Sequence, residues 1–157
     1  MERMLTTGIA APAFELPDAD MNLVKSSDFT GNKNIVLYFY PKDDTPGCTI
    51  EATEFSDLMA EFGELDTVIL GVSRDNCMSH GNFRDKFGLD ITLLADVEGQ
   101  VCREYGVWQE REKNGEARMT IVRSTFVIDK SGVLRHALYD VKPKGHAGQL
   151  LELVRNL

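Results

Sequence analysis

The strongest constraint on the fold is a continuous apolar and aromatic run, NIVLYFY at residues 34–40, which Pro41 closes. A run without polar alternation is typical of a strand buried on both faces at the centre of a sheet. A turn, DDTPG, follows, and apolar residues then recur at alternating steps of four and three, which predicts one face of an amphipathic helix. The members of this apolar stripe are Cys48, Ala52, Phe55, Met59 and Phe62.

The order of strand and then helix recurs in the middle of the chain. In the second helical segment Phe83 and Phe87 lie four residues apart, and Gly88 supplies a stop signal. Each of these helices follows a segment with the composition of a buried strand. The predicted pairs of strand and helix are 67–73 with 75–88, and 91–96 with 99–107.

The pattern changes toward the end of the chain. Residues 124–129 and 133–140 predict two strands joined by a tight turn, and residues 145–156 predict a closing helix. The charged segment QEREKNGEAR at 109–118 is interpreted as a solvated loop. Parallel pairing in the first half and an antiparallel addition later predict an α/β fold, with a central mixed sheet and helices on both faces.

Length and charge restrict the class of protein. A chain of 157 residues with 43% hydrophobic and 27% charged residues is expected to form one globular domain over residues 1–157. A net charge of −8 with scattered basic residues argues against binding to nucleic acid or to anionic lipid surfaces. Residues 1–14 resemble neither a secretory signal nor a membrane span, so we expect a cytoplasmic protein.

The three cysteines form an odd set without an export signal, which argues for reduced thiols and against a disulfide framework. Cys77 and His80 have the short spacing of zinc ligands, but no second ligand pair follows, so no metal site is expected. His136 and His146 are interpreted as ordinary surface or loop histidines.

Cys48 is the cysteine whose surroundings suggest chemistry. Thr45 suits the N-cap of the predicted helix and Pro46 its first position, which makes Cys48 the third helical residue. The free N–H groups and the dipole at a helix start stabilise a thiolate. Asp43 and Asp44 oppose that effect.

Two interpretations of Cys48 compete at this point: a small core residue at the head of an apolar stripe, or a reactive thiol. Its position after the carboxyl end of a central strand favours the reactive thiol, because active sites of open α/β sheets lie there. Glu51 stands where a C-x-x-C disulfide reductase has its second cysteine. Cys48 therefore cannot form a local disulfide, and a peroxide is the natural reaction partner.

The segment YFYPKDDTPGCTIEATEF resembles the active-site segment of the peroxiredoxin family, in its bacterioferritin-comigratory protein or peroxiredoxin Q branch. Pro41, Thr45 and Cys48 fill the P-x-x-x-T-x-x-C signature. The resemblance continues through APAFELPDAD, GVSRD, GVW and RSTFVID and so covers nearly the whole chain. It implies a thioredoxin-like fold, in agreement with the α/β architecture.

The resemblance also implies roles for five residues. Cys48 is expected to be the nucleophile that attacks the peroxide and becomes a sulfenic acid. Thr45 would cap the helix and hydrogen-bond the peroxide, and Pro41 would shield the pocket from water. Arg123 would stabilise the thiolate and the charge that develops on the peroxide oxygens, while Glu51 would orient the arginine.

The resemblance implies a thiol-dependent peroxidase that acts on hydrogen peroxide and organic hydroperoxides. Thioredoxin or a glutaredoxin-type protein would be its reductant, with no metal or flavin cofactor, and the protein would be a monomer. The alternative function is a redox sensor or holdase that is switched by oxidation of Cys48.

The sequence does not identify the thiol that resolves the sulfenic acid. Relatives with an internal resolving cysteine have it at the positions of Thr53 or Arg84, and neither residue is a cysteine here. Cys77 lies seven residues before Arg84 on the same predicted helix and could substitute, provided that the first turn around Cys48 unwinds. A one-cysteine enzyme reduced by an external thiol is the other possibility. Cys102 is interpreted as structural.

Overall fold

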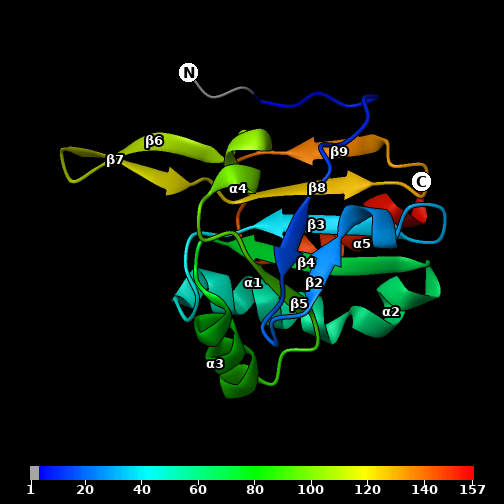
Figure 1. Ribbon diagram of the computed structural model, residues 1–157, viewed down its shortest axis with the longest axis horizontal. Coiled ribbons are helices and arrows are strands. Elements are labelled where there is room, and N and C mark those ends of the chain that lie inside the picture. The colour runs from blue at the N-terminus through cyan, green and yellow to red at the C-terminus, as the bar shows by residue number, and fades with distance from the viewer. Residues whose placement is uncertain (1–3) are drawn as a thin grey trace.

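The structure of the protein is a computed structural model that describes residues 4–157, and its centre is a five-stranded mixed sheet (Figure 1). The strand order is β5-β4-β3-β8-β9, in which β3 pairs in parallel with β4, β4 in parallel with β5, and β8 is antiparallel to both β3 and β9. This arrangement confirms the predicted mixed sheet. Its strands are β3 (Asn34–Phe39), β4 (Thr67–Ser73), β5 (Thr92–Ala95), β8 (Ser124–Ile128) and β9 (Leu134–Leu138).

The central strand is β3, as the apolar run predicts, and it is buried from Ile35 to Phe39. Alternate residues of β3 face two different hydrophobic clusters. Val36 and Tyr38 belong to one cluster, whereas Leu37 and Phe39 belong to the other. Burial of both faces therefore explains why this strand has no polar alternation.

Helices cover both faces of the sheet, as predicted. The helices α1, α2, α3 and α5 contribute to the cluster that contains Val36 and Tyr38, while α4 lies on the opposite face. Figure 1 shows β1 and β2 crossing this opposite face as a short hairpin. These elements are α1 (Pro46–Asp57), α2 (Met59–Glu64), α3 (Cys77–Phe87), α4 (Gln100–Glu104), α5 (His146–Arg155), β1 (Glu15–Pro17) and β2 (Leu23–Lys25), with a 3₁₀ turn at Ser26–Asp28.

The apolar stripe after Cys48 spans two helices and not one, because the chain bends at Leu58 between α1 and α2. The backbone of Leu58 leaves the helical region (ψ 8°), and its N–H donates to the carbonyl groups of Phe55 and Ser56. Both helices still bury their apolar residues in the same core, where the rings of Phe55 and Phe62 lie 6.2 Å apart. The periodicity thus identifies the buried face but not the bend.

The prediction of a loop at residues 109–118 is wrong, since this segment forms most of the hairpin β6 (Trp108–Lys113) and β7 (Glu116–Ile121). Asn114 and Gly115 join the strands with positive φ values of 54° and 80°, as a two-residue hairpin turn requires. Figure 1 shows the hairpin projecting from one end of the sheet. Because most of its side chains face solvent, the strands carry no apolar alternation, and the Asn-Gly pair was the available signal.

The two histidines expected on the surface or in loops have other positions. His146 is the first residue of α5 and is buried, with Nε2 2.7 Å from the hydroxyl oxygen of Thr125. His136 is partly buried and pairs with Val127 between β9 and β8. Within residues 4–157, no helix has the length and apolar character needed to cross a bilayer.

The topology brings distant segments to one edge of the sheet. Because β3 and β8 are antiparallel, with Phe39 opposite Ser124, the carboxyl end of β3 lies beside the amino end of β8. Because β3 and β4 are parallel, Ser73 at the end of β4 lies at the same edge. The turn that follows β3 is therefore flanked by Arg123, which precedes β8, and by the segment that leads from β4 into α3.

Candidate active site

Cys48 is the third residue of α1, as predicted, and its side chain is 1% exposed. Thr45 is the N-cap with extended backbone angles, and Pro46 occupies the first helical position. The Thr45 hydroxyl does not cap the helix, however, because it donates to the carbonyl oxygen of Lys42 at 2.9 Å. The expected side-chain cap is wrong, and the amides at the start of α1 have no side-chain acceptor among residues 4–157.

Arg123 joins the two other buried polar groups of this site. Its Nη2 donates to the Sγ of Cys48 at 3.3 Å, and its Nη1 donates to the Oε1 of Glu51 at 2.7 Å. Burial alone would lower the pKa of Arg123, but the charges of Glu51 and Cys48 raise it above its usual value. The guanidinium is thus a permanent cation with one donor aimed at the thiol and another at the carboxyl group.

Glu51 is fully buried, which is unusual for a glutamate in the first turns of a helix. Burial raises the pKa of Glu51 to about 7, against the opposing influence of Arg123. Its second oxygen, Oε2, has no hydrogen-bond partner among the described residues. The carboxyl group therefore exchanges its proton near neutral pH while it holds one arm of the guanidinium.

Gly47 allows the guanidinium to reach the start of α1. A Cβ atom at this position would lie 3.2 Å from Nη2 of Arg123 and 3.4 Å from Cγ of Pro143. The first distance is shorter than a normal van der Waals contact, and the second is at its lower limit. The absence of a side chain at Gly47 thus lets Arg123 and the loop before α5 pack against the helix turn that carries Cys48.

Asp43 and Asp44, which sequence alone suggested would oppose a thiolate, each have a basic side chain as their own partner. Asp43 is buried, and its Oδ2 lies 2.7 Å from Nδ1 of His80. Asp44 is exposed, has a left-handed backbone (φ 58°), and accepts from Nζ of Lys86 at 2.8 Å. Arg123 therefore does not have to offset two free carboxylates.

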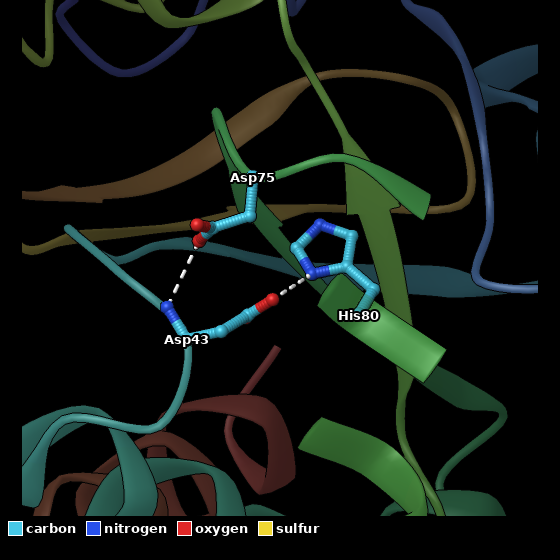
Figure 2. A group of neighbouring side chains, drawn as sticks. All are labelled: Asp43, Asp75 and His80. Atoms are coloured by element: carbon cyan, nitrogen blue, oxygen red, sulfur yellow. Dashed lines mark hydrogen bonds and ion pairs between the residues drawn. The ribbon is translucent and has the colours of Figure 1, made fainter. Parts of the chain in front are cut away.

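The same cluster contains the only group of potential metal ligands found among residues 4–157: Asp43, Asp75 and His80, with ligand atoms within 4.8 Å of one another (Figure 2). The spacing of Cys77 and His80 does not produce a zinc pair, because both ring nitrogens of His80 face oxygen atoms. Protein donors already occupy the carboxylates: Asp75 Oδ2 accepts from the backbone N–H of Asp43 and from the Ser73 hydroxyl.

The remaining candidates lie in three different parts of the fold. Pro41 is exposed and lines a groove of about 310 Å³ together with Arg74, Val97, Trp108, Met119, Thr120 and Ile121. Cys77 is the first residue of α3 and is partly exposed. Cys102 is fully buried on the opposite face of the sheet, within α4.

Sequence reasoning missed three residues of this region: His80, Tyr40 and Ser79. Their side chains all contact Asp43, although they come from β3's carboxyl end and from α3. A signal existed for His80, since it lies three residues before the buried Phe83 on the same helix and so falls on the buried face. The sequence spacing gives no sign that Asp43 is the partner of His80.

Comparisons with known proteins identify the relatives of this chain. The AhpC/TSA family model matches residues 7–137. Peroxiredoxin Bcp of Bacillus subtilis is 45% identical over 150 residues, covering 96% of this chain and 95% of that protein. Peroxiredoxin Bcp of Escherichia coli is 38% identical over 151 residues, covering 96% of both chains.

Solved structures lead to the same group. The Xanthomonas campestris bacterioferritin comigratory protein, solved in a study of its alkyl peroxide reduction, has a TM-score of 0.86 at 36% identity and covers 91% of this chain and 90% of its own. Peroxidoxin BcpB of Mycobacterium tuberculosis has a TM-score of 0.86 at 33% identity and covers 99% of both chains. The chain belongs to the AhpC/TSA family and, within it, to the thioredoxin-fold peroxiredoxins of the Bcp or peroxiredoxin Q group.

Proposed function

We propose that Cys48 is the peroxidatic nucleophile of this thiol peroxidase, which reduces hydrogen peroxide and organic hydroperoxides. The observation that carries the proposal is the position of Arg123, whose two terminal nitrogens contact Cys48 Sγ and Glu51. A buried thiol next to a fixed cation, at the start of a helix, is the environment that favours a reactive thiolate. The relatives that carry the name peroxiredoxin support the same reaction class.

In the proposed step, the Cys48 thiolate attacks one peroxide oxygen and the O–O bond breaks. The sulfur is oxidised by two electrons to a sulfenic acid, and the other oxygen leaves as an alkoxide or hydroxide that takes up a proton to give an alcohol or water. Negative charge moves from sulfur to the oxygens during this transfer. The Nη2 group of Arg123, 3.3 Å from the sulfur, is placed to stabilise that charge.

Thr45 and Pro41 complete the proposed site. The Thr45 hydroxyl donates its hydrogen to the Lys42 carbonyl, so its oxygen lone pairs remain available to accept a hydrogen bond from a peroxide O–H group. Pro41 lies two residues after the end of β3 and has no N–H group to hydrate, which suits a residue that shields the pocket from water. Glu51 orients Arg123 through the 2.7 Å hydrogen bond.

We further propose that a dithiol protein of the thioredoxin or glutaredoxin type regenerates Cys48, and that the enzyme acts as a cytoplasmic monomer in which residues 1–157 form one domain. The three free cysteines fit a reducing compartment. Both hydrophobic clusters also share the one five-stranded sheet, which fits a single domain.

Steady-state turnover tests the proposed function. With thioredoxin, thioredoxin reductase and NADPH, the wild type should consume hydrogen peroxide and an alkyl hydroperoxide continuously, and Cys48→Ser should abolish consumption. Cys102→Ser is the control, because Cys102 lies on the far face of the sheet. Loss of a single equivalent of peroxide without turnover, with the thioredoxin system and equally with a glutaredoxin system, would contradict the peroxidase proposal and favour the redox sensor or holdase.

The resolving thiol requires a separate measurement. Intact mass is recorded after one equivalent of peroxide on the wild type and on Cys77→Ser. If Cys77 resolves the sulfenic acid, the wild type should lose two hydrogens and the variant should gain one oxygen. Oxygen addition in both proteins would assign the enzyme to the one-cysteine type.

A further inference from the structure

The side chain of Asp43 is the meeting point of a buried polar network beside the site. Its Oδ1 accepts from the Tyr40 hydroxyl at 2.6 Å, and its Oδ2 accepts from the Ser79 hydroxyl at 2.8 Å and faces His80 Nδ1 at 2.7 Å. Figure 2 shows His80 on α3 pointing at this carboxylate from the side opposite the loop. The relative exposures of the Asp43 and His80 side chains are 4% and 0%, so the contact between these two residues is buried.

The hydrogen bonds of His80 determine its protonation state. Nε2 lies 2.9 Å from the carbonyl oxygen of Leu94, an acceptor only, so this nitrogen must carry a hydrogen. Nδ1 lies 2.7 Å from Oδ2 of Asp43, an ionised carboxylate that can only accept, so this nitrogen donates as well. The Tyr40 hydroxyl, 3.4 Å from Nδ1, gives its hydrogen to Asp43 Oδ1 at the shorter distance of 2.6 Å. The ring is therefore an imidazolium with both N–H groups used. Both ring nitrogens being donors, His80 has no lone pair to offer a metal ion.

The Asp43 carboxylate matches this assignment. Burial would raise its pKa, but the hydrogen bond and charge of His80, together with the Tyr40 and Ser79 hydroxyls, lower it below the usual value. The backbone N–H of Asp43 is also held, by Oδ2 of Asp75 at 2.9 Å. Main chain and side chain of this one loop residue are thus both anchored to the segment that runs from β4 into α3.

The loop that is anchored is the one that carries the chemistry. Asp43 lies two residues after Pro41 and two before Thr45, and α1 starts directly after Thr45. The chain makes a left-handed turn at Asp44 in between, a conformation that costs free energy and needs support from its surroundings. The ion pair between Asp44 and Lys86 also holds this turn, but it is exposed and contributes little.

We propose that His80 is a positioning residue of the peroxidase: its imidazolium links Asp43 to the carbonyl of Leu94 on β5 and so holds the Pro41–Thr45 loop and the first turn of α1 in the geometry that Cys48 needs. The proposal rests on the proposed function of Cys48. His80 does not contact the sulfur; it acts through Asp43 on the placement of Thr45, Cys48 and the amides at the start of α1.

The test uses His80→Gln, Asp43→Asn and the double variant of the full chain. Gln cannot supply two opposed N–H groups, so His80→Gln leaves the buried carboxylate without its cation. We expect roughly a tenfold or greater loss in the rate at which hydrogen peroxide oxidises Cys48, because small displacements of reacting groups have effects of this size or more. Amide hydrogen exchange should accelerate in residues 41–52 and not in β8.

The double variant separates a charge link from simple packing. Asp43→Asn removes the stranded carboxylate, so adding it to His80→Gln should restore part of the lost oxidation rate and part of the exchange protection. Asp96→Asn is the matched control, since Asp96 is an equally buried carboxylate that binds the amides of Val101 and Cys102 on the other face. It should leave the oxidation of Cys48 and the exchange of residues 41–52 unchanged.

Three outcomes would overturn the proposal. His80→Gln could keep the wild-type rate of Cys48 oxidation and the wild-type exchange in residues 41–52, or the double variant could lose as much as the two single variants combined. The third is that Asp96→Asn loses as much oxidation rate as His80→Gln. Failure of the proposed function is visible separately, because a wild type that shows no peroxide-dependent oxidation of Cys48 would fail before any variant is compared.

Discussion

Cys48 and Cys102 occupy the same position in two helices on opposite faces of one sheet. Each is the third residue of its helix, α1 or α4, and each is buried, with exposures of 1% and 0%. Their neighbours differ. Arg123 donates to the sulfur of Cys48, whereas the backbone N–H of Cys102 donates to the carboxylate of Asp96 at 2.8 Å.

The difference shows that a helix start does not by itself make a reactive cysteine. At α4, Asp96 accepts from the amides of Val101 and Cys102, so the donors that could stabilise a thiolate are already bound to an anion. Burial, and then the charge and hydrogen bond of Asp96, raise the pKa of Cys102 far above its ordinary value. At α1, no side chain caps the amides, and the nearby charge is a cation.

The largest effect is expected from removing that cation. Arg123→Met should lower the rate of Cys48 oxidation by hydrogen peroxide by about 10²- to 10³-fold, the usual cost of removing one charge-stabilising donor. Rapid-quench mass spectrometry of Cys48 measures this rate. Arg103→Met, an exposed change on α4, should leave it unchanged. A comparable rate in Arg123→Met and wild type would mean that the helix start alone activates Cys48.

The second prediction concerns the pH dependence of stability from Glu51, whose pKa is raised to about 7 from an ordinary 4.5. The folded protein binds this proton more tightly than the unfolded chain. The stability from this group is therefore complete below about pH 4.5 and is lost as the pH rises through about 7.

Because Gln does not ionise, Glu51→Gln should lose none of this stability. Relative to wild type, the variant should gain up to about 3 kcal/mol in the free energy of unfolding between pH 5 and pH 8. Urea unfolding at both pH values checks this. Identical pH dependence in the two proteins would show that Arg123 keeps Glu51 ionised throughout.

A third prediction tests the close packing around Cys48 with a single methyl group. Gly47→Ala places a Cβ atom 3.2 Å from Nη2 of Arg123, which should displace the guanidinium and slow Cys48 oxidation roughly tenfold. Gly148→Ala on α5 is the matched control, because its Cβ meets open space. That control should keep the rate and stabilise the protein by about 1 kcal/mol through helix propensity. Equal rates in both variants would show that Arg123 adjusts freely.

The smallest effect is expected at α4. Asp96→Asn weakens the hydrogen bonds to the amides of Val101 and Cys102 and should cost about 1 kcal/mol of unfolding free energy, as loss of a helix cap does. Cys102 should stay inert toward N-ethylmaleimide in the native protein, because burial is the largest cause of its raised pKa. Native alkylation of Cys102 in this variant would show that the charge of Asp96, and not burial, keeps it unreactive.

Much of the fold was predictable where a local pattern coincides with burial. The apolar run became the central strand β3, Pro46 began α1, and Gly88 ended α3 in a left-handed conformation. The bend at Leu58 and the exposed hairpin β6–β7 were not predicted, because periodicity reports which residues are buried and says little where a helix bends or both faces of a strand meet solvent.

The candidate site divides in the same way. Cys48, Thr45 and Pro41 were found from local spacing and from the resemblance to peroxiredoxins, and the contact between Arg123, Glu51 and Cys48 is now visible in the structure. The hydroxyl of Thr45 makes a different hydrogen bond from the expected one. From the sequence, His80 is considered only as half of a zinc pair that lacks a second ligand pair, and its partner in the structure, Asp43, lies 37 residues away along the chain.

By itself, the sequence determined the elements whose cause is local: a strand long and apolar enough to be central, a helix that starts at Pro46, and a cysteine in its first turn. Only the tertiary structure decided the charges around that cysteine. Antiparallel pairing of β3 with β8 brings Arg123 to Cys48, and parallel pairing of β3 with β4 brings His80 to Asp43. Electrostatic effects depend on distance through space, which separation along the chain does not reveal.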